Sequence, residues 1–70
     1  MNRTPVTSSN IASVGYDRAA NILEIEFTSG SIYQYTHVPL SIYDGLISAT
    51  SCGSYFSRFI KDRFTVHQIA

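Results

Sequence analysis

The chain has 70 residues, and its five basic and five acidic residues give a formal net charge of zero. A chain of this length can build only one hydrophobic core, so it predicts a single domain. Strong nucleic-acid binders usually carry a surplus of Lys and Arg, so the neutral balance argues against general nucleic-acid binding. The one cysteine, Cys52, cannot form an internal disulfide, which favours a reducing compartment.

Residues 1–8 are polar and include Pro5, so we expect a flexible lead-in before a single domain over residues 9–70. No apolar stretch has the length of a signal peptide or of a bilayer-spanning helix. We therefore expect a cytoplasmic protein that has no membrane partner.

The first predicted strand covers Ile11 to Asp17, with Val14 and Tyr16 on one face. Gly15 within it marks either a bulge or a close approach of another backbone segment. A turn from Asp17 to Asn21 follows, because Asp and Asn side chains readily form hydrogen bonds to nearby backbone groups.

The clearest strand runs from residue 22 to residue 28, where apolar and polar residues alternate. This pattern is typical of a sheet with one face on the core and one face in water. We interpret Glu24 and Glu26 as solubilising residues, since a catalytic acid–base pair needs one carboxyl in an apolar pocket. The side chains expected to face the core are Leu23, Ile25 and Phe27.

The turn after this strand decides which way Tyr33 and Tyr35 point. A two-residue loop places Tyr33 opposite Glu26 on the outer face, whereas a three-residue loop that ends at Gly30 places it opposite Ile25 on the inner face. A slip of one residue turns every side chain to the other face. We favour the three-residue loop, because glycine is preferred at its third position and the apolar residues then share one face.

Helical periodicity begins after Pro39, which can occupy the start of a helix. The apolar stripe of this first helix comprises Ile42, Leu46 and Ala49, helped by Tyr43 and Ile47. Gly45 lies inside it and costs about 1 kcal/mol relative to Ala, so either another element packs closely there or the helix is marginal.

A second helix is predicted with Ser54 as its N-cap. The chain after it, from Thr65 to Ala70, is either a short strand or a docked tail. The predicted fold class is therefore α+β: a three-stranded antiparallel sheet followed by two helices packed on one face, with room for a short C-terminal strand. An aromatic stripe is expected between the layers, made of Tyr16, Phe27, Tyr33, Tyr35, Phe56 and Phe64.

Several segments occur in a familiar order, and together they cover about residues 9–63. They read S-x-I-x-x-V-G-Y-D from Ser9, L-x-I-x-F-x-x-G from Leu23, Y-x-Y-x-x-V-P from Tyr33, I-Y-x-x-L from Ile42 and A-x-S-x-G-x-Y-F-x-x-x-I from Ala49. In this order and spacing they resemble the KTSC domain, a module at the C-terminus of some lysyl-tRNA synthetases that also occurs as small free-standing bacterial proteins. The family often has Asn where this chain has Ser57.

The resemblance implies no established activity, but the link to a tRNA synthetase suggests binding of RNA or tRNA. Tyr33 and Tyr35 correspond to the family's Y-x-Y motif, and aromatic residues two apart on a strand can stack bases. The alternative is that both rings pack in the core. The turn argument above favours core packing.

Arg58, Lys61 and Arg63 are the best candidates for phosphate contacts, because only Asp62 opposes them locally. The alternative is an ordinary solvated helix face. Tyr33, Tyr35 and these three cations form the predicted nucleic-acid-binding set.

No constellation predicts catalysis, a cofactor or a metal. Cys52, His37 and His67 have no spacing typical of a zinc site or of a cysteine nucleophile with its base. We therefore predict a non-catalytic binding module. The alternative function is a protein-interaction or self-assembly module, for which outward-facing Ile32 and Val38 would provide apolar contacts.

Overall fold

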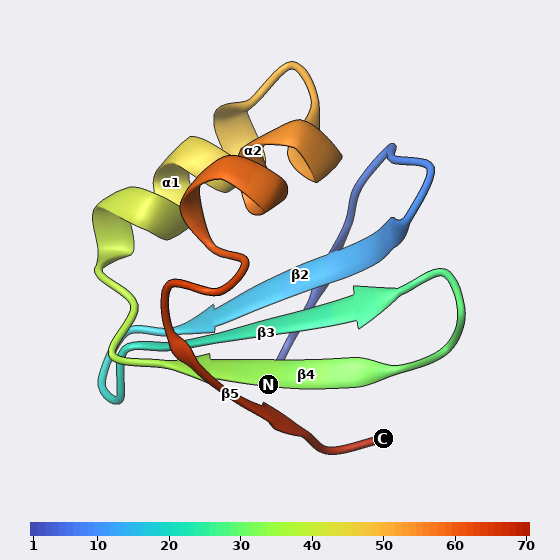
Figure 1. Cartoon of the computed structure of the whole chain (residues 1–70). Helices are drawn as coiled ribbons and strands as arrows, with labels where there is room; N and C mark the ends of the chain where they lie inside the picture. Colours follow the sequence, from blue (N-terminus) through green and yellow to red (C-terminus); the bar gives the residue numbers. More distant parts are fainter.

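The computed structural model describes all residues, 1–70. Five antiparallel strands form one sheet in the order β1-β2-β3-β4-β5, and two helices cover one of its faces (Figure 1). The helices are inserted between the fourth and fifth strands. In chain order the elements are β1 (Thr4–Pro5), β2 (Ile11–Asp17), β3 (Ile22–Phe27), β4 (Ile32–Thr36), α1 (Leu40–Ser48), α2 (Cys52–Phe59) and β5 (Thr65–Gln68).

The α+β prediction is confirmed, although the sheet has five strands and not three. The predicted C-terminal strand is β5, which pairs with β4 at one sheet edge. The fifth strand is β1, within the segment expected as a flexible lead-in. Pro5 suits this position because β1 is an edge strand, where a missing N–H costs no ladder bond.

The turn between β3 and β4 is the predicted three-residue loop. Phe27 N–H donates to the Ser31 carbonyl at 2.9 Å, and Gly30 has the left-handed φ of 98° that this loop requires. The register therefore pairs Ile25 with Tyr33. Leu23, Ile25, Phe27, Tyr33 and Tyr35 consequently share the face under the helices, whereas Ile32 pairs with Glu26 and lies on the outer face, as expected.

Nine buried hydrophobic residues form the core between sheet and helices. The aromatic stripe fills the space around it. Phe27 contacts the rings of Tyr33 and Phe56 edge-to-face, at centroid distances of 5.5 Å in both cases, and Tyr35 meets Phe56 at 5.8 Å. Val38, expected to face outward, is completely buried, so this expectation was wrong. The reason is the left-handed backbone at His37, with φ of 59°, which redirects the chain before α1.

Helices α1 and α2 pack closely through Gly45. A Cβ at this position would lie 2.6 Å from Cζ of Tyr55 and would overlap its hydroxyl oxygen. Close packing is thus the reason for a glycine inside α1. Neither helix is long and apolar enough to cross a lipid bilayer.

The N-cap of α2 is Ser51, not Ser54. The Ser51 hydroxyl accepts a hydrogen bond from Ser54 N–H at 3.2 Å, so the helix begins at Cys52. The buried Cys52 thiol donates to the Leu46 carbonyl at 3.4 Å and ties this start to the end of α1. The observed N-cap therefore lies three residues before the predicted one.

Candidate nucleic-acid interface

Tyr33 and Tyr35 both point to the inner face of the sheet. Tyr35 is only 6% exposed, and burial, with smaller contributions from Tyr33 and Asp62, raises its pKa to about 12. Tyr33 is half-buried against Phe27. Because a base needs an open ring face to stack on, this placement favours the packing interpretation of the two tyrosines.

The three predicted cations lie close together along the chain and are exposed. Arg58 is in the last turn of α2, while Lys61 and Arg63 are in the turn that follows. Arg63 Nε donates to the Arg58 carbonyl at 2.8 Å, which holds the two segments together. None of the three forms an ion pair, since both ion pairs of the chain involve Arg3.

The local backbone explains this clustering. Ile60 is fully buried and ends α2, and Lys61 N–H donates to the Phe56 carbonyl at 2.9 Å. Asp62 then adopts a left-handed φ of 62°, so the chain reverses toward β5. The buried anchor at Ile60 consequently leaves its charged neighbours in solvent.

Phe59 supplies an exposed aromatic ring beside Arg58. Its side chain is 43% exposed, its ring lies 4.7 Å from that of Tyr55, and the Arg58 guanidinium carbon lies 5.7 Å from its centroid. The Arg58–Phe59 geometry is that of a cation–π contact. We call the group Tyr55, Arg58, Phe59, Lys61 and Arg63 the cation–aromatic surface.

From the sequence we considered only Tyr33 and Tyr35 as stacking candidates, although we favoured core packing for both, and we did not consider the exposed ring of Phe59. The sequence pattern did contain this information. Phe56 and Ile60 define the side of α2 that faces the core, and Phe59 does not lie on that side. Its i,i+4 spacing from Tyr55 also predicts that the two rings meet on the helix surface. Phe59 lies outside the core stripe and directly follows Arg58, and this combination indicates a candidate stacking residue.

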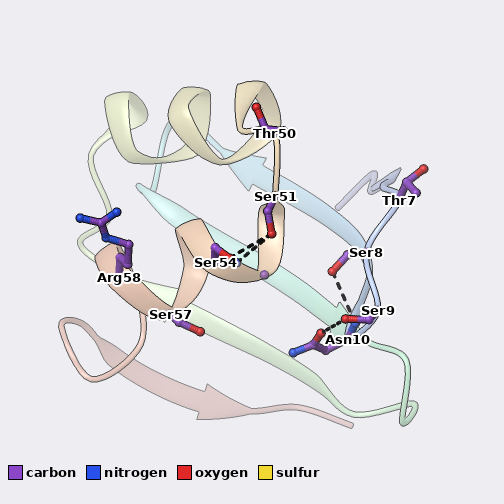
Figure 2. A pocket seen from close by; sticks show the side chains of 10 residues that line it. Thr7, Ser8, Ser9, Asn10, Thr50, Ser51, Ser54, Ser57 and Arg58 are labelled. Atoms are coloured by element: carbon purple, nitrogen blue, oxygen red, sulfur yellow. Dashed lines mark hydrogen bonds between the residues drawn. The ribbon is translucent and has the colours of Figure 1, made fainter.

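A second feature lies beside Arg58. A cavity of about 530 Å³ separates the segment before β2 from α2, and no hydrophobic residue lines it. Figure 2 shows Ser8 and Asn10 on one side and Ser51 and Ser54 on the other, with the Arg58 side chain directed away at the far end of α2. We call this cavity the hydroxyl pocket; it is lined by Thr7, Ser8, Ser9, Asn10, Thr50, Ser51, Gly53, Ser54, Ser57 and Arg58.

The polar side chains on the outer face of the sheet form a hydrogen-bond network, whereas from the sequence we expected them to be solvated. Arg3 donates to Ser13 Oγ at 3.0 Å and to Glu24, and Gln34 donates to Glu24 Oε1 at 2.8 Å. Ser13 in turn donates to Glu26 at 2.9 Å. Burial alone would raise the pKa of Glu24, which is 5% exposed, but the donors Gln34 and Arg3 outweigh it and lower that pKa. Glu24 is thus a bonded carboxylate.

The close approach anticipated at Gly15 belongs to the same face. A Cβ there would lie 2.6 Å from the Asn2 carbonyl oxygen, so the first residues cross the sheet directly over Gly15. This crossing brings Arg3 over Glu24. The N-terminal residues therefore cap the outer face.

Cys52 has no catalytic surroundings. Its thiol is buried and bonded to Leu46, whereas His37 and His67 are exposed. No group of three or more His, Cys, Asp or Glu residues could hold a metal ion.

Together these features define a small α+β module with a helix-covered sheet, a cation–aromatic surface and a hydroxyl pocket. The KTSC domain family matches residues 7–64, and the chain belongs to this family. The crystal structure of a KTSC domain protein from Yersinia pestis superposes with a TM-score of 0.96 at 40% identity, covering 99% of this chain and 97% of that one.

Relatives are of two sizes. A protein of Tsukamurella paurometabola is 43% identical over 60 residues, which are 86% of this chain and 90% of that protein. The lysine–tRNA ligase of Nostoc sp. is 42% identical over 62 residues, which are 89% of this chain but only 11% of the ligase. The same domain therefore occurs nearly alone and as a small part of a synthetase.

Proposed function

We propose that this chain is a non-catalytic module that binds single-stranded RNA through the cation–aromatic surface. The observation that carries the proposal is an exposed Phe59 ring in contact with Arg58, followed along the chain by exposed Lys61 and Arg63; none of the three cations has an acidic partner. The ligase relatives add support, because a domain of this family is part of an enzyme named for tRNA.

The physical argument combines two contributions. A base stacked on an exposed aromatic ring contributes about 1–3 kcal/mol irrespective of sequence. Cations that follow the strand bind its phosphates and release counterions. Three cations and one ring provide a short site, which fits a weak module that acts in the cytoplasm next to other RNA contacts.

A chemical-shift titration with a single-stranded oligoribonucleotide at low salt tests the proposal. Backbone amides of residues 55–63 should shift, whereas those of β1 should not. Phe59→Leu should weaken binding by about 5- to 100-fold, as expected for a lost stacking partner. Ile47→Ala is the matched control, since Ile47 is an equally exposed apolar residue (46%) on the other helix.

Two results would contradict the proposal. One is the absence of any shift at low salt. The other is equal weakening by Phe59→Leu and Ile47→Ala, which would show that exposed apolar area, and not the ring, is what matters.

The second candidate function is a protein-interaction or assembly module, and the free edge of β5 favours it. All residues of β5 are exposed, and Val66 and the following Ile69 leave 45% and 52% of their surface accessible. Edge strands with apolar side chains can pair with another chain. Sedimentation velocity over a concentration series tests this function; a strict monomer that captures no partner would contradict it.

A further inference from the structure

We infer that the hydroxyl pocket binds a ribose–phosphate unit of the RNA strand, next to the base stacked on Phe59. This inference rests on the proposed function, which it extends by assigning a second subsite. The two features adjoin at Arg58, which stands at the end of the pocket lining and whose guanidinium is directed away from the pocket, over the Phe59 ring.

The lining decides which ligand chemistry fits. No hydrophobic residue is present, so an apolar ligand would find no hydrophobic side chain to pack against. The lining also has no carboxylate, which a divalent cation would need. Seven hydroxyls and the Asn10 amide remain, since the Arg58 guanidinium is directed away; this set suits a ligand with several oxygen acceptors and some hydroxyl donors. Ribose linked to phosphate has this composition.

Several of these groups are available to a ligand. The hydroxyls of Thr7, Thr50 and Ser57 make no hydrogen bond within the chain, and neither the Asn10 amide nitrogen nor the Arg58 guanidinium donates one. By contrast, Ser51 and Ser54 already bond each other at the start of α2. Because the Arg58 guanidinium is directed away, the pocket combines the bonded pair Ser51 and Ser54 with four donors that make no hydrogen bond within the chain and that come from two separate segments.

Gly53 allows the pocket to be filled without disturbing the fold. A Cβ there would lie 3.6 Å from both Asn10 Oδ1 and Ser8 Oγ, which is ordinary contact distance. Gly53→Ala should therefore preserve the structure while it narrows the space between α2 and the facing segment. Ser57→Ala removes one uncommitted hydroxyl, and Ser41→Ala removes an exposed hydroxyl on α1 as the matched control.

Binding of an octameric oligouridylate, measured by fluorescence anisotropy, tests the inference. Ser57→Ala should weaken affinity by about three- to tenfold, the range of one lost hydrogen bond, and Gly53→Ala should weaken it by narrowing the space for the ligand. Because hydroxyls release no counterions, the salt dependence should not change. Ser41→Ala should bind as the wild type does. Wild-type affinity in both pocket variants would overturn the inference while the proposed function stands.

A titration with ribose 5-phosphate, followed by amide chemical shifts, separates the two claims. Shifts at Gly53, Ser54 and Ser57 that are absent in Gly53→Ala would support the pocket, even if the oligonucleotide does not bind and the proposed function fails. Equal shifts with inorganic phosphate alone would overturn the role of the sugar. No shift with either compound would overturn the pocket assignment altogether.

Discussion

Gly45→Ala probes the packing that holds α2, and with it the cation–aromatic surface. In a helix interior this change is favourable by about 1 kcal/mol. Here the new Cβ would lie 2.6 Å and 2.8 Å from two ring carbons of Tyr55, and overpacking of this kind costs about 1–3 kcal/mol. Two ring carbons and the hydroxyl oxygen are involved, so the upper part of that range applies, and we expect a net loss of about 1–2 kcal/mol. Thermal unfolding should then shift down by about 5–15 °C.

A double-mutant cycle gives the decisive comparison. In a Tyr55→Leu background the same Gly45→Ala change should be neutral or stabilising, because the obstructing ring is gone. Gly45→Ala should also weaken RNA binding, since the displaced Tyr55 ring lies 4.7 Å from that of Phe59. If Gly45→Ala raises the melting temperature in the wild-type background, the close helix contact described above is refuted.

Three further predictions concern buried polar groups. Arg3→Ala should destabilise the fold by about 1–2 kcal/mol at neutral pH by removing a donor from Glu24. The pKa of Glu24 is lower in the native than in the unfolded state. The stability that Glu24 contributes is therefore present above its unfolded pKa and is lost as pH falls through its native pKa. The free energy of unfolding should consequently change less between pH 7 and pH 3 in Arg3→Ala than in the wild type. Burial raises the pKa of the Tyr35 phenol to about 12, so this hydroxyl should stay neutral at pH 10.5; a lower phenolate absorbance of Tyr35→Phe than of the wild type at that pH would contradict its burial. Cys52 should react with iodoacetamide only after denaturation; rapid alkylation of the native chain would show that its thiol is accessible.

Local sequence rules predicted the β3–β4 hairpin correctly. Gly30 defines the loop, and the alternation around Ile25 then leaves one register that buries the apolar face. The role of Gly45 was also accessible, because a glycine inside a helix needs a packing reason. These predictions succeeded since turn chemistry and periodicity act over a few neighbouring residues.

The misses depend on contacts between distant residues. Strand β1 has only two residues, and it forms only because Thr4 pairs with Val14. Glu24 has the pattern of an outward, solvated residue, but Arg3 reaches across the sheet to bond it. Phe59 was passed over because its exposure depends on how α2 lies on the sheet.

The salt dependence of RNA binding tests the central claim most directly. Arg58, Lys61 and Arg63 should each neutralise one phosphate, so the logarithm of the affinity for a single strand should fall against the logarithm of salt concentration with a slope of about −2. Lys61→Ala should reduce that slope by about 0.7, whereas Arg18→Ala, which removes an exposed cation from the β2–β3 turn, should leave it unchanged. An affinity that does not vary with salt, or an equal effect of the two variants, would contradict the account.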